Sequence, residues 1–292
     1  MMVMNSPAGR GPWSIDPAHP LYPARFADLA VPPVVLWFAG RLPSSAAAEP
    51  LVSIVGSRSV TRAAAAHVTE LAAGLAAAGW SVVSGGALGI DAAAHTGALE
   101  AGGSTFAVLG CGIDVVYPDR HGKLFRGIKE RGGLMSEYGP GVQPRKGQFP
   151  VRNRLVAALG QALVIGECRR GSGALITARL AQKLGRPLLA IPGSAGADEL
   201  LAAGAASPVE SAREVLDALA GKPRSAVPPS GDTAERLQWL LQALQGGAVT
   251  ADVVAARMSV PLPEALGLLC EAELNGQVAR SAGGKFEVPG AH

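Results

Sequence analysis

The fold is decided by two stretches, LVSIVGSRSVTR at residues 51–62 and WSVVSGGALGIDAAAH at residues 80–95. Each begins with a short apolar run, turns at glycine, and continues into a segment with helical spacing of apolar residues. A strand that leads through a glycine-containing turn into a helix is the first half of a β-α-β unit. Two such units in succession predict a parallel sheet.

The same alternation continues as far as residue 191. Further apolar runs, STFAVLG, GLMSE, ALVIGE and PLLAI, lie at 104–110, 133–137, 162–167 and 187–191. The residues between the runs predict helices near 60–78, 90–101, 119–130, 152–159 and 173–184. Parallel strands joined by right-handed crossovers need helices on both faces of the sheet. We therefore expect an α/β fold, a Rossmann-like, doubly wound and mostly parallel sheet over residues 51–220.

The flanking segments predict one small additional domain. Residues 1–50 are rich in proline and lack a sustained helical period, so we expect an irregular N-terminal segment there. The Pro-, Ser- and Gly-rich stretch 221–232 is typical of a linker. Residues 233–292 then offer three helical segments followed by two short strand-like runs, which is the pattern of a winged helix.

Composition narrows the class of protein. The chain has 292 residues, of which 48% are hydrophobic and 4% aromatic, and this favours helices packed on aliphatic strands. Its three cysteines are too irregularly spaced for a disulfide framework or paired zinc ligands. Neither a signal-peptide start nor a run of about 18 apolar residues is present. We expect a cytoplasmic protein that needs no membrane, metal or cofactor.

The net charge of +3 is unevenly distributed. Residues 123–154 hold eight basic and two acidic side chains, whereas residues 232–292 hold four basic and seven acidic ones. The first region favours an anionic partner. The acidic balance of the second argues against a strong nonspecific grip on phosphates, so both duplex DNA and another protein remain open as its partner.

Two glycine-rich turns are candidate anion sites, because ligands of open parallel sheets bind beyond the carboxyl ends of the strands. Ser57 and Arg58 follow the first run, and Gly85, Gly86 and Gly89 follow the second. Glycine permits close backbone approach, a helix N-terminus offers free N–H groups, and an arginine adds donors. Taken alone, such turns are as often packing devices as binding sites.

The segment KGQFPVRNR, residues 146–154, places Phe149 between Lys146 and Arg152. Single-stranded nucleic acid is bound by cations that neutralise phosphates and by exposed rings that stack on bases. Taken alone, the segment is better explained as a solvated basic loop beside a core phenylalanine than as a binding site.

The motifs VGSRSVT, SGGALGIDAAAH, VLGCGIDVVYP, GLMSEYGPG, FPVRNRLVAALG, SGALITARLA and AIPG, taken in order across residues 51–204, resemble the DNA processing (DprA/Smf) family closely. The resemblance implies a Rossmann-like domain that binds single-stranded DNA, forms a homodimer, protects incoming DNA and loads RecA recombinase in natural transformation. It implies no catalytic activity. The residues it assigns to the DNA pocket are Ser57, Arg58, Gly85, Gly86, Gly89, Lys146, Phe149, Arg152, Asn153, Gly171, Ser172 and Gly173.

Two departures from the family pattern stand out. The helical N-terminal domain of many members is represented at most by a remnant in residues 13–40. The strand that usually ends in Val-Glu-Ala reads VIGECRRGSG here, which adds Arg169 and Arg170 beside the expected pocket. We include Arg169 among the candidate DNA contacts, although a solvated loop is an equal reading.

The main alternative is a nucleotide-processing enzyme of the phosphoribohydrolase type, because the same sheet and turns occur in such enzymes. Its catalytic carboxylate would have to be Asp91, Glu137 or Glu167. A structural adaptor without DNA contact is the third possibility, and it leaves the basic aromatic segment unexplained.

Overall fold

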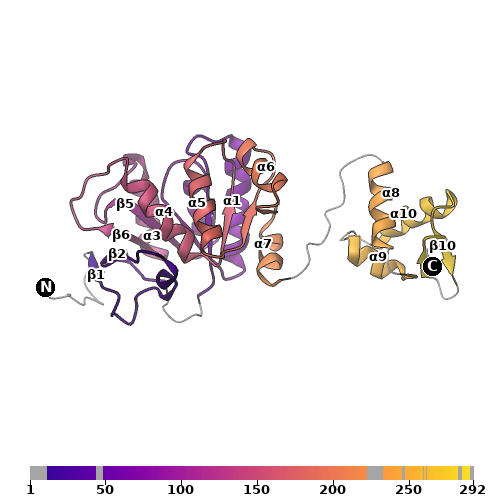
Figure 1. Ribbon diagram of the computed structural model, residues 1–292, viewed down its shortest axis with the longest axis horizontal. Helices are drawn as coiled ribbons and strands as arrows, with labels where there is room; N and C mark the ends of the chain where they lie inside the picture. Colours follow the sequence, from indigo (N-terminus) through magenta and orange to yellow (C-terminus); the bar gives the residue numbers. More distant parts are fainter. Residues whose placement is uncertain are drawn as a thin grey trace. The chain divides into compact units, whose positions relative to one another are not determined.

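The computed structural model describes residues 12–43, 49–221, 233–244, 247–258, 260, 262–281 and 285–289. The chain divides into two compact units, Met1–Gly221 and Lys222–His292 (Figure 1). Apart from Gly221, the expected linker lies outside the described residues.

The first unit is built on a sheet that has nine strands among the described residues, in the order β1-β2-β6-β5-β4-β3-β7-β8-β9. The strands from β6 to β9 pair in parallel, whereas β1 and β2 pair antiparallel. The expected mostly parallel, doubly wound sheet is thereby confirmed. The strands are β1 Trp13–Ile15, β2 Leu36–Gly40, β3 Leu51–Val55, β4 Ser81–Ser84, β5 Thr105–Gly112, β6 Gly133–Tyr138, β7 Ala162–Ile165, β8 Leu188–Ala190 and β9 Ser207–Pro208.

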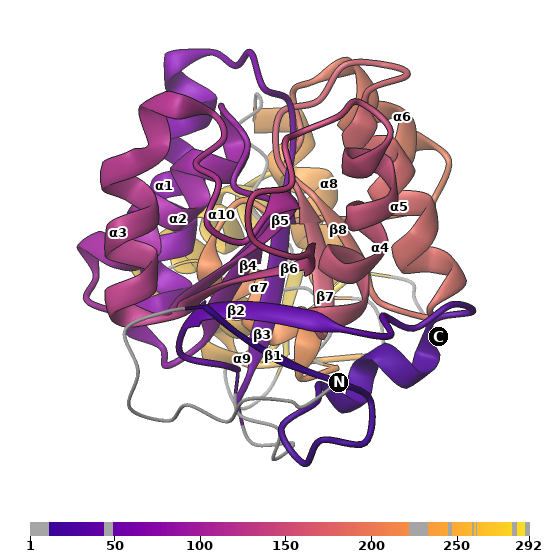
Figure 2. The ribbon, with the colours of Figure 1, turned by 90° about the vertical axis from the view of Figure 1, so that its left-hand side faces the viewer.

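Helices cover both faces of this sheet. Figure 2 shows α1, α2 and α3 on one side and α4, α5 and α6 on the other, while α7 packs against α1. Side chains of β3 pack on both faces of the sheet. Val52 and Ile54 join the core beneath α1 and α2, and Leu51 and Val55 join the core beneath α4 and α5. The helices are α1 Arg62–Ala77, α2 Ile90–Glu100, α3 Gly122–Arg131, α4 Gln148–Leu159, α5 Gly173–Lys183, α6 Ala195–Ala202 and α7 Ala212–Leu219.

Strand order reverses between β3 and β7. From β3 the chain winds through α1 to β4 on one side, and β7 later adds to the other side of β3. The connections after these two strands therefore leave in opposite directions and open a crevice at their carboxyl ends. This crevice is where the fold itself places a ligand site.

The N-terminal segment is more ordered than expected. Instead of staying irregular, it supplies β1, the edge strand, and β2, which pairs with both β1 and β6. Leu36 and Phe38 of β2 are fully buried, as is Phe26 in the short 3₁₀ helix Ala24–Asp28, which contacts α4. The prolines interrupt any helical pattern in the sequence, which is why no helix was expected there. Burial of these three apolar side chains nevertheless holds the segment in place.

The second unit has the expected winged-helix elements. Helices α8 Thr233–Ala243, α9 Ala251–Met258 and α10 Leu262–Leu274 precede the hairpin of β10 Ala279–Ser281 and β11 Lys285–Glu287. Their core includes Leu240, Val254, Leu269 and Phe286. Phe286 also forms an isolated bridge with Val249 before α9, which ties the wing to the helices.

Candidate nucleic-acid interface

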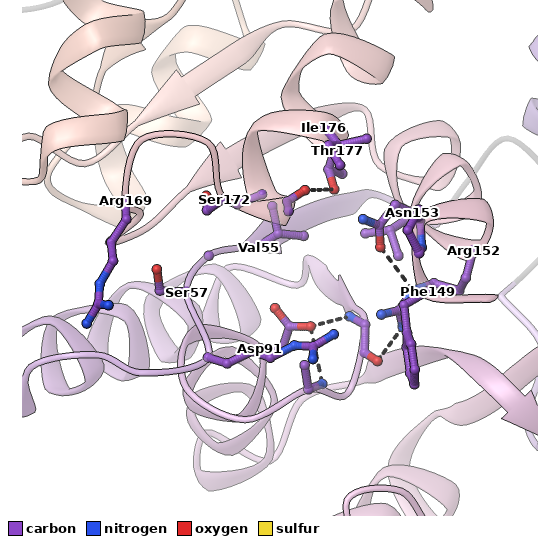
Figure 3. A pocket seen from close by; sticks show the side chains of 18 of the residues that line it. Val55, Ser57, Asp91, Phe149, Arg152, Asn153, Arg169, Ser172, Ile176 and Thr177 are labelled. Atoms are coloured by element: carbon purple, nitrogen blue, oxygen red, sulfur yellow. Dashed lines mark hydrogen bonds between the residues drawn. The ribbon is translucent and has the colours of Figure 1, made fainter. Parts of the chain in front are cut away.

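The crevice at the reversal point holds a pocket with a volume of about 520 Å³, here called the switch-point pocket. Its walls are the turns after β3, β4 and β7 and the first half of α4. Figure 3 shows Ser57 and Arg169 on one side of this pocket and Phe149 on the other. Segments more than 100 residues apart in the sequence thus contribute to one site.

The first turn is fixed from behind by Glu167. The Glu167 carboxylate accepts hydrogen bonds from the Thr61 hydroxyl at 2.7 Å and the Thr61 backbone N–H at 3.1 Å. The Ser57 N–H donates to the backbone carbonyl of Glu167 at 2.8 Å. Thr61 also caps α1 by accepting from the Ala64 N–H. Glu167 therefore holds the turn that carries Arg58 and is itself engaged.

An aromatic stack lies at the other end of the pocket. The guanidinium of exposed Arg58 lies 5.3 Å from the centroid of the Phe149 ring, and the Tyr117 ring lies 5.5 Å from it at an angle of 36°. Phe149 rests on Gly110, where an added Cβ would come within 2.8 Å of its ring. A cation and a second ring thus both approach the Phe149 ring, and aromatic rings with nearby cations are what stack with nucleobases.

The rim of the pocket is cationic and rich in donors. Lys146 and Arg169 are exposed, and both line the pocket. Ser172 and Gly173 bring the N-terminus of α5 to the same cavity, and backbone N–H groups at a helix N-terminus attract anions. Asn153 of α4 lines the opposite wall.

The floor of the pocket contains a buried arginine. Arg152 is 4% exposed, and its Nη1 donates to the backbone carbonyls of Gly85, directly after β4, and Val108, in the middle of β5. Burial lowers the pKa of this guanidinium, and the neighbouring Asp91 carboxylate opposes that shift. Arg152 lines the pocket as expected, but its donors are directed into the protein and clamp two strands.

Asp91 is the buried counter-charge of the floor. Its carboxylate accepts hydrogen bonds from the N–H groups of Gly85 at 3.1 Å and Ala87 at 3.2 Å (Figure 3). Burial raises the pKa of Asp91, while the charge of Arg152 lowers it. This carboxylate shapes the second glycine turn.

His95 lies beneath the same floor and does not line the pocket. Its Nδ1 is 2.7 Å from the Thr105 hydroxyl, which itself donates to the Val82 carbonyl, so Nδ1 carries the proton. Its Nε2 has no hydrogen-bond partner among the described residues. Burial, reinforced by the electrostatic influence of neighbouring His121 and Arg152, lowers the pKa of His95 to about 3, so the ring is neutral.

The third candidate carboxylate is also engaged. Glu137 forms an ion pair with Arg154 at 2.6 Å. Because Asp91 and Glu167 hold turns and Glu137 holds Arg154, each of the three carboxylates considered for catalysis has a structural partner.

A second cavity of about 380 Å³ adjoins the first. It is lined in part by Leu109, Cys111, Pro118 and Arg120. The two cavities share the residues Arg58, Gly85, Ala87, Tyr117, Phe149 and Arg152. The aromatic stack therefore borders both cavities.

Most of the predicted site residues come together. The residues that line the switch-point pocket are Ser57, Arg58, Gly85, Lys146, Phe149, Arg152, Asn153, Arg169, Ser172 and Gly173. Gly86 lines the second cavity only, whereas Gly89 and Gly171 line neither. Gly89 has a φ of +76°, and a Cβ there would lie 2.2 Å from the Ser57 carbonyl oxygen, so it serves packing between the two turns.

Sequence reasoning missed Tyr117 as a site residue. The motif VLGCGIDVVYP contained it, but an isolated tyrosine after a strand carries no local signal for stacking. Only the tertiary fold brings it against Phe149, which is 32 positions further along the chain.

A pocket lined by exposed cations and aromatic rings at the switch point, together with a separate winged helix, indicates a Rossmann-like protein with a ligand-binding crevice and an accessory domain. The particular family follows from comparison with known proteins. Residues 13–220 match the family model of DNA recombination-mediator protein A, and residues 223–284 match the DprA winged helix domain. The chain belongs to this DprA/Smf family, as its motifs indicated.

Relatives support the assignment. The putative DNA processing protein DprA of Mycobacterium tuberculosis is 39% identical over 272 residues, covering 88% of this chain and 69% of the relative. DprA of Streptococcus pneumoniae is 42% identical over 173 residues, covering 59% and 60%. Protein Smf of Synechocystis is 38% identical over 192 residues, which cover 65% of this chain but only 48% of that protein.

Solved structures agree on the fold. The X-ray structure of DprA from S. pneumoniae has a TM-score of 0.66 and 39% identity, covering 70% of this chain and 72% of that one. A structure described as showing the single-stranded DNA binding mode of DprA from Helicobacter pylori has a TM-score of 0.65 and 33% identity, covering 72% and 96%. Among the described residues, no helix is long and apolar enough to cross a membrane.

Proposed function

We propose that the protein binds single-stranded DNA in the switch-point pocket and acts as a noncatalytic mediator that delivers this DNA to a RecA-type recombinase. The observation that supports the proposal most strongly is the stack of Arg58, Phe149 and Tyr117 beside the anion-binding turns. Unpaired bases need a stacking surface and their phosphates need cations, and this pocket offers both.

Arg58 has two roles in the proposed mechanism. Before DNA arrives, its guanidinium covers one face of the Phe149 ring. A cation–π contact at an exposed site is worth about 0.5–1 kcal/mol, so Arg58 leaves the ring at small cost. It then pairs with a phosphate, for which its fork of donors is suited, and a base takes its place on the ring.

The rim supplies the remaining phosphate contacts. Lys146 and Arg169 both line the pocket as exposed cations, and the α5 N-terminus adds backbone donors. These contacts read the backbone and not the base edges, so we expect little sequence preference. The protein thus suits DNA of any origin.

The engaged carboxylates speak against the enzymatic alternative. A phosphoribohydrolase needs a carboxylate free to act on the ribose, and Asp91, Glu137 and Glu167 are each held by other protein groups. We therefore propose that the site binds without chemistry.

The test of DNA binding is fluorescence anisotropy with labelled oligo-dT at several salt concentrations. We expect the wild type to bind with a clear salt slope, and Arg58→Ala to bind at least tenfold more weakly. The matched control is Arg213→Ala, which removes an exposed arginine paired with Asp217 on α7. If the wild type does not bind, and instead hydrolyses a nucleoside monophosphate, the enzyme interpretation replaces this one.

Delivery to the recombinase needs a separate assay. We propose that a homodimer, with α6 and its half-buried Leu200 and Leu201 at the contact, presents the bound strand to RecA. RecA ATPase activity on DNA precoated with single-strand-binding protein should begin earlier when the protein is added. An unchanged lag, together with intact DNA binding, would restrict the function to DNA protection.

A further inference from the structure

The start of α3 carries an exposed basic surface that the switch-point pocket does not use. Arg120, in the short 3₁₀ helix before α3, and Lys123 and Arg126, in its first two turns, are all exposed. None of the three forms an ion pair with another described residue. Three cations without carboxylate partners on neighbouring turns point to an anionic partner.

This surface is continuous with the DNA pocket through the second cavity. Arg120 lines that cavity, which shares Arg58, Tyr117 and Phe149 with the switch-point pocket. The surface therefore begins where the aromatic stack ends. A DNA strand that leaves the stack of Arg58, Phe149 and Tyr117 therefore meets Arg120 first and α3 next.

The start of α3 is also held rigidly against the pocket floor. His121 Nδ1 lies 3.0 Å from the Gly86 carbonyl oxygen. Phe125 packs against Gly86, where an added Cβ would lie 3.1 Å from its ring. Lys123 and Arg126 are thus anchored through their neighbours at a fixed place relative to the pocket.

The local charge favours phosphates despite one carboxylate. Asp119 lines the second cavity beside Arg120, so residues 119–126 combine one acidic side chain with three basic ones. Lys123 and Arg126 are three residues apart, and such residues lie on neighbouring turns of a helix face with about 5–6 Å between their Cβ atoms. Successive phosphates of one strand can meet successive side chains along this face.

We propose that Arg120, Lys123 and Arg126 form a track along which the single strand held in the switch-point pocket continues over α3. The track rests on the proposed function and extends it. The protein holds one segment of DNA by stacking and a neighbouring segment by charge alone. Its effective site is longer than the pocket.

The test compares short and long oligonucleotides. We compare a chain of about 5 nucleotides, chosen to occupy the pocket, with one of about 20, chosen to reach the track as well, because known single-strand sites span about 4–16 nucleotides per OB fold. The double variant Lys123→Ala/Arg126→Ala should bind the short oligonucleotide like the wild type. It should bind the long one several-fold more weakly, with a salt slope reduced by about 1.4, because each phosphate contact contributes about 0.7.

The matched control is Lys129→Ala/Arg131→Ala, which removes the same charge from the last turn of the same helix. It should leave the slope for the long oligonucleotide unchanged. The proposal is overturned if the first variant keeps the wild-type slope, if the control loses as much, or if short and long oligonucleotides weaken equally. If the wild type itself fails to bind the short oligonucleotide, the proposed DNA pocket fails as well, which is a different result.

Discussion

The floor and the rim of the pocket both present arginine, yet the two arginines differ in almost every physical respect. Arg152 on the floor is 4% exposed and donates to two backbone carbonyls. Arg58 at the rim is exposed, and its guanidinium lies over the face of the Phe149 ring. The first is fixed by its partners and the second is free to exchange them.

This difference separates stability from binding within one site. Removing one member of a buried ion pair leaves the other charge buried without a partner, which lowers the free energy of unfolding by several kcal/mol. An exposed charge contributes little to folding, but it is available to a phosphate. We therefore expect floor variants to unfold the protein and rim variants to leave it folded without its ligand.

The largest expected effect is on the floor. Arg152→Met leaves the Gly85 and Val108 carbonyls without their donor and Asp91 without a nearby cation, so we expect a loss of about 3–5 kcal/mol in the free energy of unfolding. Urea denaturation followed by tryptophan fluorescence measures it. Adding Asp91→Asn to the same variant should recover part of the loss, whereas a loss below about 1 kcal/mol in the single variant would show that the clamp is unimportant.

A second floor effect is on pH dependence. Because the pKa of His95 falls to about 3 in the folded state, the unfolded chain takes up a proton on this ring below its ordinary 6.5. Stability should then decrease as the pH drops from about 6.5 toward 3, by about 1.4 kcal/mol per pH unit from this group. His95→Gln should have a flatter profile in thermal unfolding between pH 6.5 and 4.5. Parallel profiles would contradict a neutral His95.

At the rim, the aromatic ring should matter most. Phe149→Leu keeps apolar contact with Gly110 but removes the stacking surface, so we expect a loss of about 1–3 kcal/mol in binding oligo-dT. Phe149→Tyr is the matched control and should bind nearly as well as the wild type. Anisotropy titrations measure both. Equal weakening of the two variants would point to a packing role for the ring.

The smallest effect should distinguish two adjacent arginines. Arg169 lines the pocket, whereas Arg170 does not. The Nε of Arg170 instead forms an ion pair with the Glu199 carboxylate at 3.4 Å. Arg169→Ala should lower the salt slope of DNA binding by about 0.7, and Arg170→Ala should leave it unchanged. Neither variant should shift the midpoint of urea unfolding. If the two variants behave alike, this loop attracts DNA only through its overall charge and not through a specific contact of Arg169.

Much of the fold was predictable because local pattern and global architecture agree. The runs at 51–55 and 162–167 are apolar at nearly every position, as strands covered on both faces must be. Strand β2 was not predicted, because it is held between β1 and β6 by pairing with residues 13–15 and 133–136, which no local period reveals. Tertiary burial of Phe38 decides its conformation.

The sequence predicted which residues form the site better than it predicted what each of them does. Arg152 and Arg58 look equivalent as letters in basic motifs, and only burial distinguishes the clamp from the free cation. Gly89 was expected beside the ligand, but the carbonyl of Ser57 occupies the space next to it. Tyr117 had no sequence signal, since its partner ring lies on a different element.

The pairing of β2 with β6 has a consequence for synthesis on the ribosome. Strand β6 begins roughly 90 residues after β2 ends, so at about 5–20 residues per second β2 waits on the order of 5–20 s for its partner. During that interval Leu36 and Phe38 have left the exit tunnel without the strand that buries them. The emerging N-terminal segment is therefore a binding target for chaperones that recognise short apolar stretches, and completion of the sheet edge ends that exposure.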